Sequence, residues 1–212
     1  MPVRNVVRYF APHTYYHVYN RGHNKDLLFA DADDYRFFRF LLQRCFGPLQ
    51  LQSSRGKSFP WFGDRVLLNA FCLMPNHFHL LLHQAEDETA VSKAMQSLGT
   101  TYSMYFNRKH QRRGSIFESV FKASPILSDV YLQHITRYIH LNPKGYPTWE
   151  HSSYQDFIGT NSNHWVAKHE ILELFDSVEQ YQEFVDDYTA LHEEFETLKH
   201  ELADHGITYY KT

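Results

Sequence analysis

The stretch FCLMPNHFHLLLH, residues 71–83, decides how the rest of the chain folds. Its Pro75-Asn76 pair interrupts an apolar run and predicts a turn. The residues after this pair have the length and the apolar content of a strand. Because successive side chains of a strand point to opposite faces, His77 and His79 share one face, while Phe78 points to the other. The stretch therefore predicts a strand with one apolar face and one face that carries imidazoles.

Two imidazoles that stand one strand position apart can aim their nitrogens at a single metal ion. His77 and His79 have this spacing, and His83 continues the same face. The chain contains 15 histidines, so polar side chains on a solvated face are the competing interpretation. A zinc hydrolase that uses all three histidines is a further alternative, but it lacks an obvious acidic ligand or base nearby.

Length and composition bound the class of protein. With 212 residues and 43% hydrophobic content, the chain can bury a core and holds one domain, or one domain with an appendage. Its two cysteines, Cys45 and Cys72, form no disulfide framework and no CxxC metal motif. No apolar run is long enough for a membrane span, and residues 1–10 have no signal-peptide core. We therefore expect a cytoplasmic protein that does not bind membranes.

The net charge of −3 hides an asymmetry along the chain. Residues 1–169 contain 19 basic and 12 acidic side chains, whereas residues 170–212 contain 2 basic and 12 acidic ones. A basic body followed by an acidic tail fits a domain that binds a polyanion and carries a separate helical appendage. Charge blocks are also found on ordinary solvated faces, so this asymmetry favours a nucleic-acid partner without establishing it.

The remaining elements follow from periodicity and turn signals. In addition to the histidine strand, strands are expected at residues 14–20, at residues 65–74 and within SIFESVFKAS (115–124). Helices are expected at residues 31–46, 89–110 and 129–141. Asp129 is the expected N-cap of the last helix. The order is β-α-β-β-α-β-α. This order predicts an α+β fold of the ferredoxin-like, split βαβ type, with an antiparallel sheet and helices on one face.

The acidic tail predicts a helical appendage. Residues 171–204 are expected to form one long amphipathic helix or two shorter ones, and Asp176 and Ser177, followed by Glu179 and Gln180, are typical of an N-cap with a capping box. An apolar stripe that recurs every seven residues predicts packing on the body: Leu174, Tyr181, Tyr188, Phe195 and Leu202. A dimer seam is less favoured because His192 and Lys199, which lie between stripe positions, are polar.

The helix expected at 129–141 carries a second set of functional candidates. Tyr138 and Asn142 are four residues apart and therefore lie on one face, a turn from each other. If this helix crosses the sheet beside the histidine strand, His77, His79 and the amide of Asn142 can hold one divalent ion next to the phenol. Imidazole and amide ligands with open water positions suit Mg²⁺ or Mn²⁺ better than a closed zinc site.

A tyrosine in such a place can act as a nucleophile toward a phosphodiester. The phenol has a pKa of about 10 and is a poor nucleophile at neutral pH. It becomes useful when it is aligned with a phosphodiester that a metal polarises. The chain contains 15 tyrosines, so a role in the core is the competing interpretation of Tyr138. Tyr131 is the substitute nucleophile if Tyr138 faces the core.

Basic side chains mark candidate contacts to phosphate. Four of them cluster within six positions at the end of the helix expected at 89–110: Arg108, Lys109, Arg112 and Arg113. Such a cluster complements the helix dipole and equally suits a phosphate-binding patch. Arg21, Lys122 and Arg137 are further candidates for contact with DNA.

Several motifs resemble one family. MPNHFHLLL is similar to the HUH (His-hydrophobe-His) motif of single-tyrosine transposases, and together with YYHVYNRG, GSIFESVFKAS and ITRYIHLNP it resembles the REP-associated tyrosine transposases over about residues 13–158. This resemblance implies a ferredoxin-like catalytic domain, a divalent metal (Mg²⁺ or Mn²⁺) and a single-stranded DNA substrate with a hairpin. It also implies nicking and strand transfer through a 5′-phosphotyrosine intermediate.

By this resemblance His77 and His79 match the HUH metal ligands, Tyr138 the nucleophile and Asn142 the third, amide ligand. We expect residues 1–160 to form the transposase-like nuclease domain and residues 161–212 an acidic helical extension. The resemblance leaves open a monomer or a homodimer and implies association with the nucleoid. The alternative function is a domesticated hairpin-DNA-binding protein with little or no cleavage activity.

Overall fold

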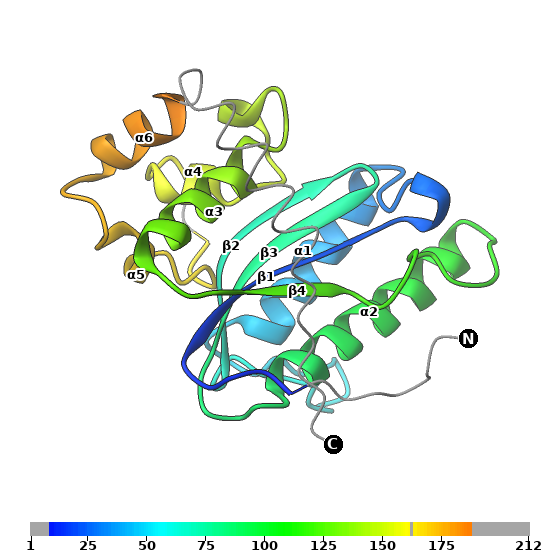
Figure 1. Ribbon diagram of the computed structural model, residues 1–212. Helices are drawn as coiled ribbons and strands as arrows, with labels where there is room; N and C mark the ends of the chain where they lie inside the picture. Colours follow the sequence, from blue (N-terminus) through cyan, green and yellow to red (C-terminus); the bar gives the residue numbers. More distant parts are fainter. Residues whose placement is uncertain (1–8, 162, 188–212) are drawn as a thin grey trace.

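The fold is seen in a computed structural model, which describes residues 9–161 and 163–187 (Figure 1). Its main elements occur in the predicted order: β1 (Thr14–Arg21), α1 (Ala32–Phe46), β2 (Val66–Met74), β3 (His77–Gln84), α2 (Ala90–Lys109), β4 (Lys122–Ile126) and α3 (Asp129–Leu141). Shorter elements are the 3₁₀ turns His23–Lys25 and Tyr146–Thr148 and the helices α4 (Tyr154–Phe157), α5 (His169–Leu172) and α6 (Val178–Asp186).

The four strands form one antiparallel sheet in the order β2-β3-β1-β4. The histidine strand β3 is therefore central, between β2 and β1. β2 and β3 form a hairpin whose turn is the predicted Pro75-Asn76 pair. In the register, His79 lies opposite Tyr19 of β1 and Cys72 of β2. Directly opposed residues share a face of the sheet, so the register fixes which side chains surround the imidazoles.

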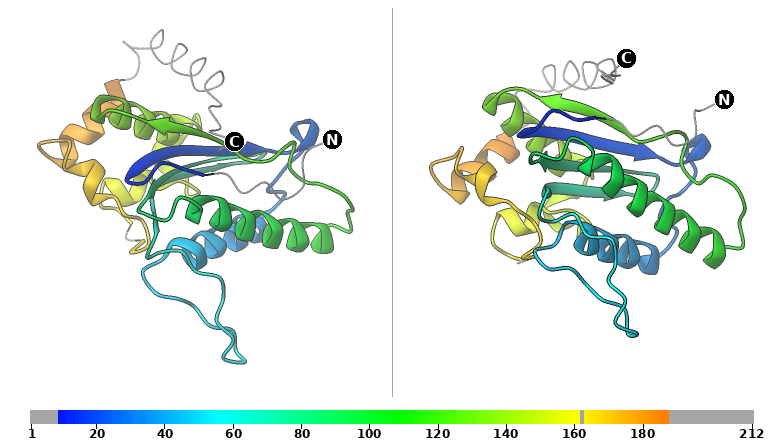
Figure 2. Two further views of the ribbon diagram at one scale, coloured as in Figure 1. Left: turned by 60° about the horizontal axis from the view of Figure 1, so that its bottom comes forward. Right: turned by 90° about the horizontal axis from the view of Figure 1, so that it is seen from below.

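The sheet is covered on both faces. Helices α1 and α2 lie on one face, and α3 lies over the other (Figure 2). Phe78 of β3 meets Phe38 of α1 with ring centroids 5.3 Å apart, which identifies the apolar face predicted for this strand. The α+β, ferredoxin-like class is thus confirmed, with the two helices of the split βαβ unit on one face. Because α3 adds a layer over the imidazole face, that face is not simply solvated.

Helix α1 begins where its sequence signal predicts. The Asp31 carboxylate caps it by accepting the backbone N–H groups of Asp33 (3.0 Å) and Asp34 (3.2 Å), which satisfies two donors that the first turn leaves free. The apolar residues that recur along residues 31–46 with a helical period are all buried: Tyr35, Phe38, Leu41, Leu42 and Cys45. The 3.6-residue period of apolar side chains was therefore sufficient to identify the packed side of this helix.

The start of α3 differs from the prediction. The N-cap is Ser128, whose hydroxyl accepts the backbone N–H of Tyr131 at 3.2 Å, and Asp129 is the first helical residue. Serine and aspartate cap helices about equally well, so the sequence signal did not distinguish two adjacent positions. Near the other end of α3, His140 is fully buried between the hydroxyls of Tyr181 on α6 (2.5 Å) and Ser153 (2.7 Å). These contacts fix the rotation of α3 about its axis.

The last strand lies later in the chain than predicted. β4 covers Lys122–Ile126, whereas the segment 115–121 forms no strand and pairs with the chain near the end of β1 through an isolated bridge between Phe117 and Gly22. Pro125 lies within β4 and disfavoured this position in the sequence, because proline removes a ladder donor. β4 is an edge strand that pairs with β1 alone, and an edge strand tolerates proline. The strand that was predicted within residues 115–124 therefore overlaps β4 at residues 122–124 alone, and its predicted start was wrong.

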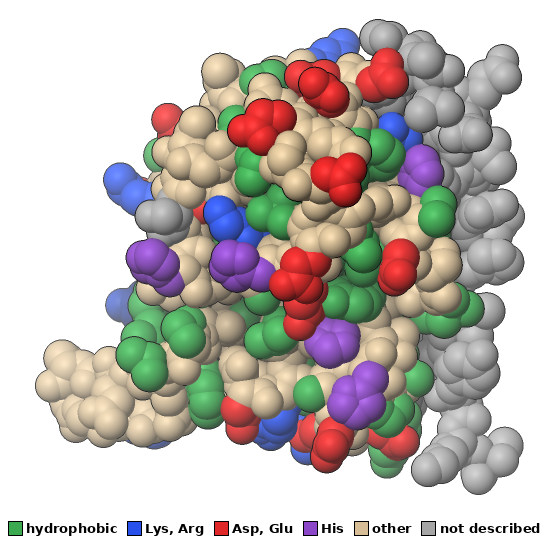
Figure 3. All heavy atoms as spheres, turned by 90° about the vertical axis from the view of Figure 1, so that its left-hand side faces the viewer, with side chains coloured by type: hydrophobic (Ala, Val, Ile, Leu, Met, Phe, Trp, Pro, Cys, Tyr) green, Lys and Arg blue, Asp and Glu red, His purple; other side chains and the backbone are tan. Residues whose placement is uncertain are grey.

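The described part of the acidic extension packs on the body. Ser177 is the N-cap of α6 and accepts the N–H of Gln180 (3.2 Å), as predicted, whereas the Gln180 amide oxygen accepts the N–H of Asp176 (2.7 Å) instead of the Ser177 N–H that completes a capping box. Tyr181 and Val185 are buried. The outer side of α5 and α6 exposes acidic side chains (Figure 3): Glu170, Glu173, Asp176, Glu179, Glu183, Asp186 and Asp187. The stripe positions Tyr188, Phe195 and Leu202, with His192 and Lys199, lie outside the described residues.

None of the helices in the described ranges combines the length and the apolar character needed to cross a bilayer. The division between residues 1–160 and 161–212 stays a prediction.

Candidate active site

The four residues singled out as metal ligands and nucleophile meet on the sheet face under α3. His77 and His79 come from β3, and their rings lie 5.1 Å apart at 86°. Asn142, directly after α3, brings its Oδ1 within 3.3 Å of His77 Nε2. The ring of Tyr138 lies edge-on to that of His79, with centroids 5.3 Å apart. Helix α3 therefore crosses the sheet beside the histidine strand, as the spacing argument required.

Neighbouring amides hold the imidazole of His77 in one orientation. The Asn142 Nδ2 donates to the backbone carbonyl of Tyr138 (3.0 Å), so its Oδ1 faces His77. On the other side of the ring, Asn76 Nδ2 donates to the Lys25 carbonyl (3.3 Å), and its Oδ1 lies 2.7 Å from His77 Nδ1. Each ring nitrogen of His77 therefore faces an amide oxygen.

This arrangement fits a bound cation. A neutral imidazole carries one N–H, and the shorter contact, between His77 Nδ1 and Asn76, takes it. The other nitrogen of His77 then presents a lone pair toward the oxygen of Asn142, which is also an acceptor. Two acceptors that face each other are unfavourable without a positive charge between or beside them. Imidazole nitrogen and amide oxygen are ligands that Mn²⁺ accepts, and the amide oxygen also suits Mg²⁺.

Burial keeps these imidazoles in the neutral form that can bind a metal. The pKa of His77 is lowered chiefly by burial and further by the charge of Arg21, and the nearby amide oxygen of Asn142 acts in the opposite direction. The pKa of His79 lies well below its ordinary value of 6.5, first because of burial and then because of the neighbouring imidazoles of His17 and His77. Lone pairs are therefore available on both rings at neutral pH.

A third histidine belongs to this site and was not among the predicted site residues. His17 on β1 is 1% exposed, and its Nε2 lies 2.9 Å from His79 Nδ1. Its ring stacks on that of His79 (5.0 Å) and lies edge-on to Tyr138 (5.8 Å). Burial lowers the pKa of His17 to about 3. The alternation of TYYHVYN places His17 on the same face as Tyr19, but only the pairing of β1 with β3 reveals what lies beside it.

Two of the predicted DNA contacts border the site. Arg21 lies opposite His77 in the β1–β3 register, and its guanidinium pairs with the Glu118 carboxylate. Lys122 lies opposite Tyr19 in the β1–β4 register, with its ammonium 5.8 Å from the centre of the Tyr19 ring. Because opposed residues share a face, both cations stand on the imidazole face of the sheet.

The basic cluster at the end of α2 is partly used inside the protein. Lys109 forms ion pairs with Asp31 and Asp34, and Arg112 Nη2 lies 3.3 Å from an Asp26 oxygen. Arg108 and Arg113 are exposed. The chain after α2 returns to the end of β1 through the Gly22–Phe117 bridge, so these two arginines are the members of the cluster best placed to reach a polyanion near the site.

Arg137 has a different environment from the one predicted. It is 2% exposed, its Nη1 donates to the Phe184 carbonyl (3.2 Å), and its guanidinium lies 4.2 Å from the centre of the Phe184 ring. These contacts join α3 to α6. A buried guanidinium that is engaged by α6 cannot reach a DNA phosphate, so we remove Arg137 from the candidate DNA contacts.

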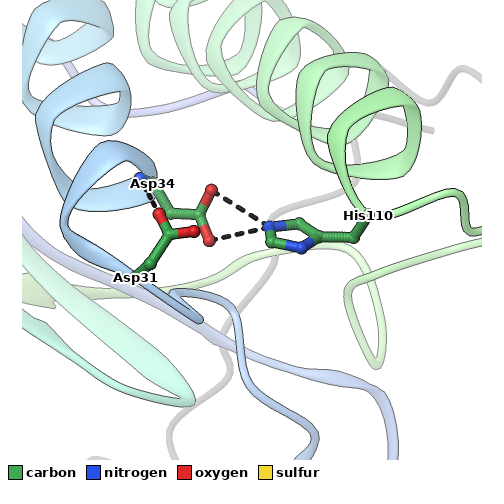
Figure 4. Close-up of side chains that lie close together, drawn as sticks. All are labelled: Asp31, Asp34 and His110. Carbon is green, nitrogen blue, oxygen red and sulfur yellow. Dashed lines mark hydrogen bonds and ion pairs between the residues drawn. The ribbon is translucent and has the colours of Figure 1, made fainter.

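A second group of metal-type side chains lies on the other side of the sheet. Asp31, Asp34 and His110 place ligand atoms within 4.8 Å of one another (Figure 4). Asp34 is fully buried and accepts from His110 Nε2 at 2.9 Å and from Lys109 Nζ at 2.9 Å. The ammonium of Lys109 also pairs with Asp31, so a cation already lies between the two carboxylates. We interpret this group as an ion-pair cluster that joins the start of α1 to the end of α2.

His83 does not join the other two histidines of β3. It lies four residues from His79, which corresponds to about 13 Å along a strand. Its ring packs at 4.6 Å from that of Tyr15, whose hydroxyl donates to Glu170 (2.5 Å). The three-histidine set of a zinc hydrolase is therefore not assembled.

Comparison with known proteins shows what the segment that carries this site is similar to. Residues 63–142 match the model of a family described as "Transposase IS200 like", and this segment contains His77, His79, Tyr138 and Asn142. No curated protein matches the chain. The resemblance to single-tyrosine transposases is thereby confirmed for the segment that carries the site.

A solved structure, described as "Structure of the REP associates tyrosine transposase bound to a REP hairpin", shares the fold. The match has a TM-score of 0.53 and 16% sequence identity, and it covers 79% of this chain and 91% of that one. At this identity the likeness concerns the fold. It agrees with the antiparallel sheet and the flanking helices described above.

Proposed function

We propose that this protein nicks single-stranded DNA beside a hairpin and transfers the cut strand, with Tyr138 as nucleophile and His77, His79 and Asn142 as ligands of a divalent ion. The proposal is supported by the convergence of two imidazoles, one amide oxygen and one phenol from β3 and α3. It is further supported by the family match, which covers all four residues, and by the solved transposase of the same fold, which is bound to a REP hairpin. We propose that it acts on DNA in the cytoplasm.

The proposed reaction is a transesterification at phosphorus. The Tyr138 phenol gives its proton to water, and its oxygen attacks the scissile phosphate. The bond from phosphorus to the 3′ oxygen of the preceding nucleotide breaks, and that oxygen takes up a proton to become a free 3′-OH. The 5′ phosphate remains on the tyrosine, and a 3′-OH that attacks this phosphotyrosine later restores the phenol and joins the strands.

A bound Mg²⁺ or Mn²⁺ would polarise the phosphodiester and stabilise the charge that develops on its oxygens. The chain itself supplies orientation. Asn76 holds His77, the backbone of α3 holds the amide of Asn142, and Tyr138 lies one helical turn before Asn142. The nucleophile and the ligands are therefore carried by only two rigid elements, which restricts their relative motion.

Charge suggests where the DNA strand runs. Arg21 and Lys122 flank the imidazole face, and Arg108 and Arg113 lie exposed at the end of α2, whereas the outer side of α5 and α6 is acidic (Figure 3). Phosphates are attracted to the first surface and repelled by the second. We propose that the strand crosses the β1–β4 edge of the site and that the hairpin stem extends toward the end of α2.

The deciding experiment uses hairpin oligonucleotides labelled at either end and incubated with Mg²⁺ or Mn²⁺. Wild-type protein should retain the label downstream of the cut in a covalent adduct on a denaturing gel, and Tyr138→Phe should abolish the adduct while leaving hairpin binding unchanged. Tyr131→Phe is the matched control, because Tyr131 lies on the same helix two turns earlier. An adduct that persists in Tyr138→Phe and disappears in Tyr131→Phe would transfer the nucleophile to Tyr131.

The same experiment addresses the alternative, a hairpin-binding protein with little or no cleavage activity. Binding by the wild type without an adduct, across several hairpins and with both metals, would favour that alternative.

A further inference from the structure

His17 has no assigned role in metal binding or cleavage, yet it is the nearest polar neighbour of one proposed ligand. Its Nε2 lies 2.9 Å from His79 Nδ1, and the two rings stack with centroids 5.0 Å apart. The other nitrogen, His17 Nδ1, is buried and has no hydrogen-bond partner among the described residues. The contact with His79 is therefore the one polar interaction of this ring in the described part of the chain.

The placement of protons links this contact to the metal. His79 Nδ1 is occupied by His17, so only Nε2 of His79 can bind an ion on the side of Asn142. A neutral imidazole that binds a metal through Nε2 carries its proton on Nδ1. That N–H must then be donated to His17 Nε2, which acts as an acceptor. The alternative, in which His17 donates to His79, leaves a proton on His79 Nε2 and prevents that nitrogen from binding the ion.

We propose that His17 is the positioning residue of the metal site: it accepts the Nδ1–H of His79 and so keeps the Nε2 lone pair of His79 directed at the ion. This inference rests on the metal site proposed above. Asn76 holds His77 in the corresponding way, through its contact with His77 Nδ1 at 2.7 Å. Both ligand histidines thus have an acceptor behind the ring, and removal of such a partner usually weakens metal binding 10- to 100-fold, as an order of magnitude.

The acceptor role makes a specific prediction about substitutions. The amide oxygen of His17→Gln can reach the place of the imidazole Nε2 and accept the same N–H, whereas His17→Leu fills the space without an acceptor. We expect His17→Leu to weaken Mn²⁺ binding by about 10- to 100-fold and His17→Gln to restore most of the affinity. A residue that only fills the core would give the opposite order, because leucine suits a buried apolar position better than glutamine.

The test is a titration of the full-length protein with Mn²⁺ alone, in which electron paramagnetic resonance measures the free ion. His83→Leu is the matched control, because His83 lies on the same face of β3 but packs against Tyr15. Chemical denaturation of each variant without metal separates loss of affinity from loss of fold. In addition, two-bond ¹H–¹⁵N spectra of the Mg²⁺-loaded wild type should place the proton of His79 on Nδ1.

The outcomes separate the two proposals. Failure of the wild type to bind Mn²⁺ would overturn the metal site and, with it, the role of His17. Binding by the wild type that is unchanged in His17→Leu, or equally reduced in His17→Gln and His17→Leu, would overturn the role of His17 and leave the metal site intact. A proton found on His79 Nε2 in the Mg²⁺-loaded protein would also overturn it.

Discussion

Two clusters on opposite faces of the sheet contain side chains of the kind that bind metals, and they differ in what already neutralises them. Asp31 and Asp34 pair with the ammonium of Lys109, and His110 contacts the Asp34 carboxylate. His77 and Asn142 instead direct acceptor atoms at each other across 3.3 Å, and the charged side chain that affects the pKa of His77 is the cation of Arg21. If ligand type and proximity were the only criteria, the first cluster would be the candidate metal site. The balance of donors, acceptors and charge instead favours the second cluster as the metal site.

The largest expected effect is a loss of metal binding when a histidine of the second cluster is replaced, with no loss when a histidine of the first cluster is replaced. His77→Ala should weaken Mn²⁺ binding and metal-dependent cleavage by more than about 100-fold, because loss of a ligand should exceed the 10- to 100-fold cost of losing a partner behind a ligand. His110→Ala should leave both unchanged. Titration with Mn²⁺ and the adduct assay on both variants check this. The reverse pattern would move the metal to the aspartate cluster.

The aspartate cluster should instead matter for stability. Asp34 is fully buried and accepts from Lys109, from His110 and from the backbone N–H of Ala30 (2.9 Å). Asp34→Ala removes the acceptor of the Ala30 N–H and of His110, while Lys109 keeps its ion pair with Asp31, and a buried donor that is left without its acceptor costs about 1–3 kcal/mol. Urea denaturation should therefore show a large decrease in the free energy of unfolding.

The control for this prediction is Asp33→Ala on the same helical turn. Asp33 is exposed and pairs with Arg36 at the surface, and an exposed ion pair contributes about 0–1 kcal/mol. Mn²⁺ affinity should be the same in both variants. Equal stability of the two variants would contradict the structural role of the aspartate cluster.

The contrast also explains which parts of the site could be predicted from the sequence. His77 and His79 follow from the two-residue period of a strand, and Tyr138 and Asn142 follow from the helical period, so each pair is fixed by local geometry. The meeting of the two pairs required α3 to cross β3 on the face opposite to α1 and α2, and the predicted fold class, with its helices on one face, did not imply this crossing. His17 depends on the register between β1 and β3, and no local pattern encodes this register.

The errors have the same origin. Arg137 and Tyr138 are adjacent and both polar, but α6 covers one side of α3 and the sheet covers the other, so their side chains have different surroundings. Lys109 resembles a phosphate contact until Asp31 and Asp34, about 75 residues earlier in the chain, are seen beside it. The predicted position of β4 was wrong because Pro125 disfavoured a strand there, whereas an edge strand tolerates proline. Long-range packing decided each of these cases.

The last effect is the smallest near neutral pH and grows with acid, and it involves buried histidines on the α3 side of the sheet rather than the ion-pair cluster. His17 and His140 are buried, and burial lowers the pKa of each to about 3 from an ordinary 6.5. Below pH 6.5 the unfolded chain binds protons that the folded protein excludes. The free energy of unfolding is therefore greatest above the unfolded pKa and falls as the pH decreases from 6.5 toward 3, by about 1.4 kcal/mol per pH unit for each such imidazole.

His140→Gln tests this slope without removing a ligand. The glutamine amide can keep one of the contacts of His140 with Tyr181 and Ser153, but it does not titrate. The variant should lose stability near neutral pH, because one contact is lost, yet its decline between about pH 6 and pH 4 should be shallower by roughly 1.4 kcal/mol per pH unit. Urea denaturation at several pH values measures both quantities. Parallel curves for wild type and variant would mean that His140 takes up its proton in the folded state, and that α3 is held over the imidazole face by contacts other than a neutral His140.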